Sequence, residues 1–263
     1  MRSVGRWLQH PLTRGLSVDD PRTTQRRREI IRSKPFLRRV YREWYGLVRE
    51  SLPPGPGAVL ELGSGAGFLR DVLPEAITSE VFPAPGVSLI ADGHRLPFGD
   101  DRLRAVVLVD VLHHIPDCRR FFAEAARCVR PDGALVAVEP WASAWSRFIY
   151  GRLHHEPFQP SASQWEFPSS GPLSGANQAL PWILLERDRT AFEAEFPQWR
   201  IARVQPFMPL SYLASGGVGL RSLAPGWAYP LVAGLERLAE PAMAKLAMFA
   251  HIVLRRAPAP TGK

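Results

Sequence analysis

Short apolar runs alternate with amphipathic stretches along most of the 263-residue chain. Seven apolar runs predict buried strands, near residues 58–62, 77–81, 88–91, 105–110, 133–139, 199–207 and 248–255. Between them, the patterns near residues 67–74 and 118–129 predict helices. Strands that alternate with helices are typical of a parallel sheet with helices on both faces. We therefore expect an α/β fold with a doubly wound sheet.

An amphipathic helix is predicted near the N-terminus, beginning at Ser33-Lys34-Pro35 with Ser33 as its cap. Its apolar residues recur at helical spacing and are Leu37, Val40, Tyr41, Trp44, Leu47 and Val48. The helix should end before the proline- and glycine-rich residues 53–57, and residues 1–23 are expected to form an irregular arm. We expect the helix to pack on the sheet edge or cover a ligand pocket. A basic helix lying at a membrane surface is the alternative.

Positive charge is concentrated at this end of the chain. Residues 1–50 contain 13 Lys and Arg and 5 Asp and Glu, whereas residues 51–263 contain 20 of each. Because the larger part is neutral, we expect no nucleic-acid groove across it. An anionic partner for the basic arm stays open, either a membrane surface, an acidic carrier or a phosphate-bearing substrate.

Residues 141–180 form a long stretch without a regular pattern, rich in Ser, Pro, Gly and aromatic residues. Such a segment in a compact domain is usually functional, and this one follows the fifth strand, where open α/β sheets bind ligands. We expect a lid-like insertion that recognises a substrate. Beyond it, residues 181–196 predict a helix, and residues 230–246 predict one that Pro241 kinks or divides. The side chains expected to face inward there are Leu231, Leu235, Leu238 and Met243.

Three glycines follow the first predicted strand at alternate positions. The strand at residues 59–62 contains an acid, and Gly63, Gly65 and Gly67 come next. Glycine lets the backbone approach a ligand closely, so this turn predicts a nucleotide-type site at the first crossover. A dinucleotide fingerprint places its third glycine three positions after the second. Phe68 occupies that position, which argues against a nicotinamide-dependent reductase.

Four blocks carry a wider pattern, and they are Val59–Phe68, Leu89–Phe98, Ala105–Asp117 and Val129–Pro140. In addition, Glu80 lies 19 residues after Glu61, about where a ribose-binding acid is expected. In order and spacing the blocks resemble the type 11 branch of the class I S-adenosylmethionine-dependent methyltransferases. The resemblance implies a Rossmann-like, seven-stranded, mostly parallel sheet in the order 3-2-1-4-5-7-6 with an antiparallel last strand. It also implies S-adenosyl-L-methionine as the cofactor.

By this resemblance, the glycine turn would hold the methionine and ribose parts of the cofactor. The backbone contacts would come from Gly63, Ser64, Gly65 and Gly67. Glu61 would orient the turn or its waters, and Glu80 would accept hydrogen bonds from the ribose hydroxyls. Ordinary solvated acids at these two positions are the alternative.

The other end of the predicted cofactor site lies after the third and fourth strands. Asp92 would bind the adenine amino group, with Gly93 and His94 close by, and Asp110 and Val111 would line the methionine end. Asp92 could instead only cap a turn. A helix between Glu80 and Asp92 is excluded by prolines and a glycine, which leaves one wall of the adenine pocket in question.

Methyl transfer from a sulfonium is an in-line displacement, so the protein mainly aligns the reactants and excludes water. A base is needed only if the acceptor loses a proton. His113 and His114 follow the fourth strand, where the methyl group would emerge, and either is a candidate base. Packing or loop orientation is the alternative for both. The residues His154-His155-Glu156 lack further ligands at metal spacing, so we expect no metal site.

The chain is expected to divide into five parts. They are a basic arm with an amphipathic helix (1–56), the cofactor-binding half of the methyltransferase domain (57–140), an acceptor or lid segment (141–180), the C-terminal half of the sheet with its helices (181–258) and a tail (259–263).

The predicted function is S-adenosylmethionine-dependent methyl transfer to a small or lipid-linked acceptor. The alternative is a non-catalytic or vestigial S-adenosylmethionine-binding protein that docks on an anionic partner or membrane surface. Cys118 and Cys128 lie in one predicted helix, about 15 Å apart along its axis, so we expect two reduced thiols. With no signal-peptide core in residues 1–6 and no apolar run of membrane-spanning length, we expect a cytoplasmic protein, with peripheral membrane contact as the alternative.

Overall fold

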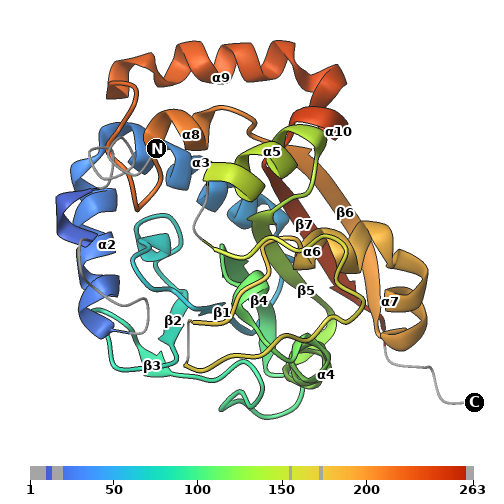
Figure 1. Ribbon diagram of the computed structural model, residues 1–263. Helices are drawn as coiled ribbons and strands as arrows, with labels where there is room; N and C mark the ends of the chain where they lie inside the picture. The colour runs from blue at the N-terminus through green and yellow to red at the C-terminus, as the bar shows by residue number, and fades with distance from the viewer. Residues whose placement is uncertain (1–9, 14–19, 154–155, 172–173, 259–263) are drawn as a thin grey trace, which may run out of the picture.

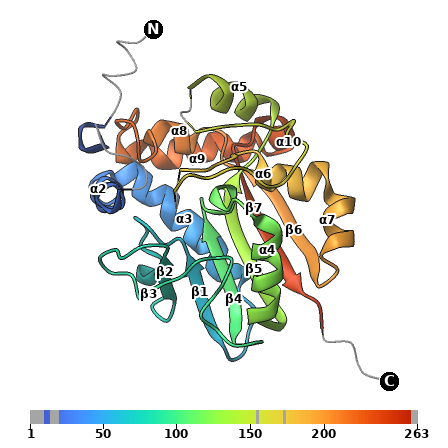
Figure 2. The same ribbon diagram turned by 60° about the horizontal axis from the view of Figure 1, so that its bottom comes forward.

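Figure 1 shows the computed structural model, which describes residues 10–13, 20–153, 156–171 and 174–258. A seven-stranded sheet forms its centre, and helices cover both faces of the sheet (Figures 1 and 2). The strands are β1 (Ala58–Leu62), β2 (Ile77–Glu80), β3 (Leu89–Ile90), β4 (Leu103–Val109), β5 (Val129–Pro140), β6 (Trp199–Phe207) and β7 (Phe249–Arg256). Their order is β3-β2-β1-β4-β5-β7-β6.

The strand pairing confirms the predicted fold class. Strands β1 to β5 pair in parallel, and β7 is antiparallel to both β5 and β6. The carboxyl ends of the parallel strands therefore meet at one edge of the sheet. An open α/β sheet binds its ligands at that edge, near the point where the strand order reverses. Here the reversal lies between β1 and β4, the strands that precede the glycine turn and the two predicted catalytic histidines.

Alternate residues of the central strands face two separate cores. Val106 and Leu108 of β4 pack with helix α4 (Cys118–Cys128), whereas Ala105 and Val107 pack with helix α3 (Pro35–Ser51). Successive side chains of a strand point to opposite faces, so a strand covered on both faces is apolar throughout. This explains the continuous apolar runs in the sequence. Both cysteines of α4 are buried and free, as expected.

The N-terminal region holds more helix than predicted. A short 3-10 turn, η1 (Pro11–Thr13), is followed by helix α2 (Pro21–Ser33), and the carboxylate of Asp20 accepts a hydrogen bond from the backbone N–H of Arg22. The expectation of an irregular arm is therefore wrong from residue 20 onward, and residues 1–9 and 14–19 lie outside the described part. Ser33 ends α2 rather than capping α3. The break between the helices falls before Pro35, because proline disfavours helical backbone in the residue before it.

The prediction of a helix at residues 67–74 is wrong. Only a 3-10 turn, η2 (Leu69–Asp71), forms there. Gly67 donates its N–H to the carbonyl of Ser64, and Phe68 has φ −143°, so the backbone leaves the glycine turn in a non-helical conformation. Pro74 then stops any further turn, since its ring clashes with the preceding helical backbone.

The segment after β5 begins with a helix that was not predicted, α5 (Ala144–Leu153). Ser143 and Ser146 cap it reciprocally, since each side chain accepts a hydrogen bond from the other's backbone N–H. From residue 156 to residue 179 the described chain is irregular, as expected. The helix predicted at residues 181–196 forms as three pieces, α6 (Leu180–Trp182), a π-helical turn η4 (Ile183–Arg187) and α7 (Arg189–Glu195).

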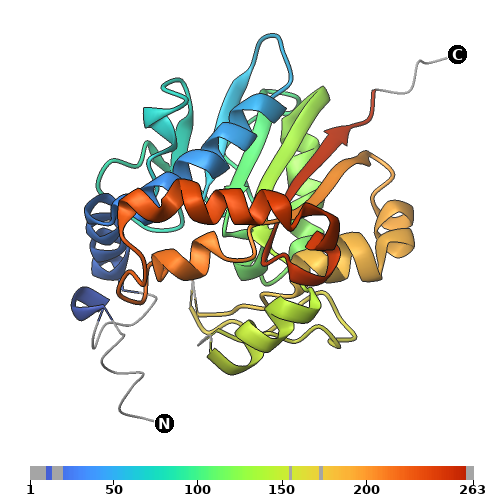
Figure 3. The same cartoon turned by 90° about the horizontal axis from the view of Figure 1, so that it is seen from above.

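The C-terminal helices lie outside α3 (Figure 3). They are α8 (Ser211–Ser215), η5 (Gly226–Ala228), α9 (Tyr229–Leu238), η6 (Glu240–Ala242) and α10 (Met243–Leu246), and Pro241 falls in the break between α9 and α10. The expectation that the leucines of α9 face inward is wrong, because Leu231, Leu235 and Leu238 are 64%, 57% and 81% exposed. Glu236 faces inward instead, and its carboxylate accepts hydrogen bonds from the backbone N–H groups of Leu210 and Ser211. None of the helices among the described residues is long and apolar enough to cross a membrane.

Candidate active site

The glycine turn lies at the carboxyl end of β1 and depends on residues without side chains. Gly63 and Gly65 have φ +66° and +45°, a region that costs little only for glycine. A Cβ on Gly63 would also come within 2.9 Å of both methyl groups of Val111, which follows β4. Ser64 ties the turn to β2 by donating its N–H to the carbonyl of Ser79 at 2.7 Å. The turn is thus held in place between β1, β2 and the end of β4.

Two buried acids flank this turn. Glu61 and Glu80 are only 2% and 3% exposed, and Glu80 Oε1 lies 3.4 Å from where a Cβ of Gly65 would be. Burial raises the pKa of Glu61 to about 8 and raises that of Glu80 as well, although a hydrogen bond from the Val81 N–H opposes the shift at Glu80. Glu61 Oε2 has no hydrogen-bond partner in the described part of the protein. A buried carboxylate oxygen without a partner is suited to a ligand that donates a hydrogen bond.

The residues predicted to hold adenine lie after β3. Asp92 Oδ1 accepts hydrogen bonds from the backbone N–H of His94 at 2.9 Å and contacts His94 Nδ1 at 2.7 Å. The Asp92 side chain is 64% exposed. A Cβ on Gly93 would lie 3.0 Å from Leu62 Cδ2, so the backbone here is pressed against the end of β1. Asp92 therefore caps a turn with Oδ1. Its side chain is otherwise exposed, close to the carboxyl end of β1.

Helices α2 and α3 cover the glycine turn from the other side. Tyr45 of α3 accepts a hydrogen bond from the Phe68 N–H at 3.1 Å, and its ring packs edge-on against Phe68. Arg28 of α2 donates to the carbonyl of Pro85 in the loop after β2. The cavity beside Gly65 has a volume of about 20 Å³, and it is lined by Thr24, Gln25, Arg28, Gly65, Ala84 and Pro85. Gly63, Gly65 and Gly67 are half-buried, and α2 narrows the space beside Gly65.

A second group of polar residues gathers after β4, in the 3-10 turn η3 (Leu112–His114). Asp110 precedes it with φ +63°, and burial raises the pKa of Asp110 to about 6. Glu139, at the end of β5, is 0% exposed and binds the turn with both oxygens. Its Oε1 accepts from the N–H groups of Val111 and Leu112, each at 2.8 Å, and its Oε2 lies 2.8 Å from His113 Nδ1.

His113 and His114 differ sharply in pKa. Burial lowers the pKa of His113, but the Glu139 and Glu156 carboxylates outweigh burial and raise it to about 10. Burial and the neighbouring His113 lower the pKa of His114 to about 4. His114 Nδ1 lies 3.1 Å from the carbonyl of Gly175, which can only accept, so Nδ1 carries the proton and Nε2 is bare. His114 is therefore the histidine that is neutral near pH 7.

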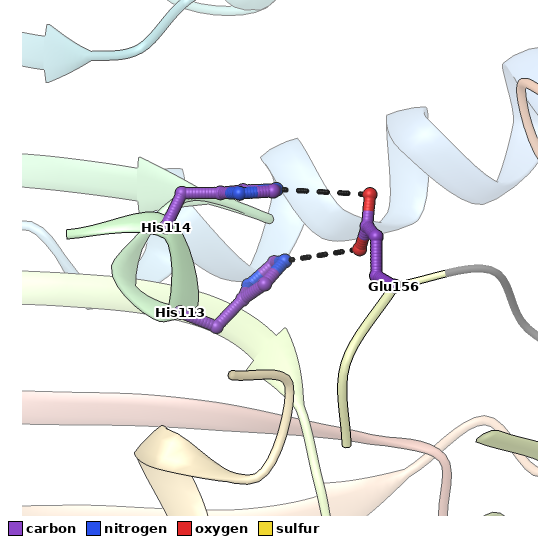
Figure 4. A group of neighbouring side chains, drawn as sticks. All are labelled: His113, His114 and Glu156. Atoms are coloured by element: carbon purple, nitrogen blue, oxygen red, sulfur yellow. Dashed lines mark ion pairs between the residues drawn. The ribbon is translucent and has the colours of Figure 1, made fainter. Parts of the chain in front are cut away.

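Glu156 completes this group from the segment after α5 (Figure 4). Its Oε2 lies 3.7 Å from His113 Nε2, and its Oε1 lies 3.9 Å from His114 Nε2. The sequence did not single out Glu139 as functional, and it gave Glu156 only a weak hint through the adjacent histidines. An acid at the end of the fifth strand was the one available signal for Glu139. His154 and His155 lie outside the described residues.

The predicted site residues therefore fall into two adjoining groups at one edge of the sheet. The first consists of the glycine turn with Glu61 and Glu80, and Asp92, Gly93 and His94 lie beside it at the end of β3. The second consists of Asp110, His113 and His114, with Val111 joining the two through its contact with Gly63. The first group fits a nucleoside, because its close-packed glycines admit a ligand against the backbone and its acids accept hydrogen bonds from hydroxyls.

Comparison with known proteins agrees with this geometry. Residues 60–137 match the type 11 methyltransferase family, described as a methyltransferase domain. Demethylmenaquinone methyltransferase from Mycobacterium marinum is 32% identical over 111 residues, which cover 37% of this chain and 48% of the relative. The matched region thus spans about half the length of this curated relative.

Solved structures share the fold. Geranyl diphosphate C-methyltransferase from Streptomyces coelicolor, in complex with Mg²⁺, geranyl diphosphate and S-adenosyl-L-homocysteine, is 12% identical with a TM-score of 0.53. The alignment covers 95% of this chain and 92% of that one. The methyltransferase bound to the Haloferax volcanii activator Trm112 is 16% identical with a TM-score of 0.53, over 94% of this chain and 100% of that one.

The fold, the glycine turn and the family match together define a class I methyltransferase domain. Residues 60–137 match the type 11 branch, and this match supports S-adenosyl-L-methionine as the cofactor.

Proposed function

We propose that the protein transfers a methyl group from S-adenosylmethionine to a small or lipid-linked acceptor by in-line displacement. The observation that carries this proposal is the glycine turn at the end of β1, flanked by the two buried acids Glu61 and Glu80. Bound there, the cofactor supplies a methyl group already activated by a sulfonium. The protein's task is then to hold the reactants in line and to keep water out.

Each residue of the first group has a role in binding. The backbone of Gly63 and Gly65 would lie against the methionine and ribose parts, where a Cβ would intrude. Glu80 would accept hydrogen bonds from the ribose hydroxyls, and Asp92 would accept one from the adenine amino group. Glu61 Oε2, which lacks a partner, would take a hydrogen bond from the ligand or from a water that the ligand holds.

The acceptor would approach from the irregular segment at residues 156–179. This segment is tied to η3, because the N–H of Asn177 donates to the carbonyl of His113 at 2.9 Å and His114 Nδ1 bonds Gly175. It therefore forms a wall at the end of β4, where the methyl group would emerge. His114, bare at Nε2, is the candidate to accept a proton from an acceptor hydroxyl.

Exposed apolar side chains on the outer face of α9 favour a lipid-linked acceptor. Leu231, Leu235 and Leu238 are exposed there, and Leu223 and Trp227 just before the helix are 61% and 72% exposed. An amphipathic helix whose apolar face meets solvent is suited to lie in a membrane interface. The relative from Mycobacterium marinum, named for its action on demethylmenaquinone, points the same way.

Two measurements test this function. Calorimetry should show saturable binding of S-adenosylmethionine and S-adenosylhomocysteine, and incubation with methyl-labelled cofactor should move label into the organic phase of a lipid extract. Binding without any transfer of label to lipid or water-soluble fractions would favour the alternative, a vestigial cofactor-binding protein. No binding at millimolar cofactor would overturn both.

A further inference from the structure

Three side chains from two distant parts of the chain converge beside the end of β4. They are His113 and His114 of η3 and Glu156 of the segment after α5, and Figure 4 shows both rings directed at the Glu156 carboxylate. One ligand atom from each residue lies within 4.8 Å of the ligand atoms of the other two. Imidazole nitrogens and a carboxylate oxygen are the donors that divalent transition cations prefer.

Each of the three side chains is oriented by a further partner. His113 Nδ1 is 2.8 Å from Glu139 Oε2, and His114 Nδ1 is 3.1 Å from the carbonyl of Gly175. Gln178 Nε2 donates to Glu156 Oε2 at 2.8 Å. Metal-bound histidines usually donate their second ring N–H to a carboxylate or a carbonyl, which fixes the ring and turns the other nitrogen toward the metal. Both histidines have this arrangement here.

The nitrogen at the centre of the group has no hydrogen-bond partner among the described residues. His113 is 1% exposed, and its Nε2 is 3.7 Å from Glu156 and 4.0 Å from Asp110, both beyond hydrogen-bond distance. Buried polar atoms without partners are rare, because each costs free energy to remove from water. A cation between these groups would give the His113 nitrogen a partner and would attract the Asp110 and Glu156 carboxylates.

The charge of the surroundings also favours a cation. Three carboxylates lie around the two rings, those of Asp110, Glu139 and Glu156, and the Glu139 side chain is fully buried. Carboxylates crowded into a poorly solvated space repel one another. A divalent cation offsets more of this charge than a single imidazolium does.

We propose that His113, His114 and Glu156 bind a divalent transition cation of the Zn²⁺ type. The His113 and His114 ligand atoms would be Nε2. The ligand atoms, which now lie within 4.8 Å of one another, would move closer together around a cation to reach the usual ligand distances of about 2.0–2.2 Å. Three protein ligands leave a coordination position open for a water or for an oxygen of another molecule. Although the sequence predicts no metal site, the ligands lie 42 residues apart along the chain and meet only in the fold. Cofactor binding at the glycine turn does not require this site. A bound cation would occupy His114 Nε2, however, so His114 could not then accept a proton from the acceptor, and the open coordination position would face the acceptor instead.

The test is a zinc titration of tag-free protein that a chelator has first freed of metal. Wild type should bind about one equivalent of Zn²⁺, and Co²⁺ should give the absorption of a site with nitrogen ligands. Mg²⁺ should not compete, because it prefers all-oxygen sites. Glu156→Gln and His114→Ala should each weaken zinc binding at least tenfold, and Glu139→Gln by about 10- to 100-fold.

His10→Ala is the matched control, since His10 lies in a separate part of the fold and its removal should leave zinc affinity unchanged. Near-ultraviolet circular dichroism checks that each variant is folded. If Glu156→Gln fails to fold, the partly exposed His114 supplies the deciding variant. The proposal is overturned if folded wild type binds no zinc saturably, or if the folded ligand variants bind it as tightly as wild type.

Discussion

At the scale of single residues, the cofactor site depends on groups that are absent as much as on those present. Gly63 and Gly65 can let a ligand lie against the backbone because they lack a Cβ, and the sequence shows these glycines directly. The acids around them are different. That Glu61 and Glu80 are almost fully buried follows from α2 and α3 lying over the turn, which no local pattern near residue 61 indicates.

A side chain at Gly65 should abolish cofactor binding. Gly65→Val places a Cβ 3.4 Å from Glu80 Oε1 and strains a backbone at φ +45°. We expect at least a tenfold loss of affinity for S-adenosylhomocysteine, measured by calorimetry. Gly151→Val is the control, because a Cβ there meets nothing within 4 Å and the site lies on α5. Equal affinity of the two variants would contradict the assignment of the turn.

Glu61 should make the cofactor-free protein less stable as pH rises. Its pKa is about 8 in the folded protein against an ordinary 4.5, so between these values the folded state holds a proton that the unfolded chain has released. The free energy of unfolding therefore falls across this window. Glu61→Gln removes this contribution. We expect the free energy of unfolding of this variant, relative to that of wild type, to increase by about 1 kcal/mol or more from pH 5 to pH 8.

Urea unfolding at pH 5 and pH 8 measures this difference. Glu75→Gln is the control, because the Glu75 side chain is 57% exposed and lies at the surface beside Arg104. The burial argument fails if the difference between Glu61→Gln and wild type is the same at both pH values.

At the scale of elements, the amphipathic patterns of α3 and α4 predicted two helices well. Where they failed, proline and glycine decided the backbone, as at Pro74, or a capping pair of serines began a helix, as at α5. The largest omission was α2, whose mostly polar sequence gives little periodic signal. Its place is defined by tertiary contacts, among them the hydrogen bond from Arg28 to Pro85.

Loosening α2 should speed cofactor entry. Arg28→Ala removes the contact with the loop after β2 and a wall of the small cavity beside Gly65. We expect a severalfold rise in the association rate of S-adenosylmethionine, followed by stopped-flow tryptophan fluorescence. Arg26→Ala is the control, since Arg26 pairs with Glu29 of the same helix at 2.9 Å. If both variants bind at the wild-type rate, α2 is not the barrier to entry.

At the scale of the whole molecule, the outer side of α9 carries exposed apolar side chains. The exposed leucines of α9 lie on the outer side of the C-terminal helices, with Arg237 exposed on the same helix. This arrangement was not predicted. The period of the leucines indicated a buried face, but the interior side of α9 is taken by Glu236, whose carboxylate holds the start of α8.

The α9 surface should bind anionic membranes. Leu235→Glu combined with Leu238→Glu should reduce flotation with vesicles of phosphatidylglycerol and phosphatidylcholine at least fivefold, because apolar insertion is lost. Ile90→Glu, at an exposed position of β3, should leave flotation unchanged. Salt should weaken only the electrostatic part of the contact. Wild type that fails to float at low salt would rule out this surface as a membrane contact.

The sequence by itself determined the fold class and the cofactor turn, because apolar runs suit buried strands and glycines allow close backbone approach. The order of the strands came from the resemblance of four sequence blocks to a known family. Only the tertiary structure decided that α2 closes over the turn, that Glu139 and Glu156 reach His113 and His114, and that α9 turns its leucines outward. These depend on contacts between residues far apart in the chain, whose free energy no local pattern contains.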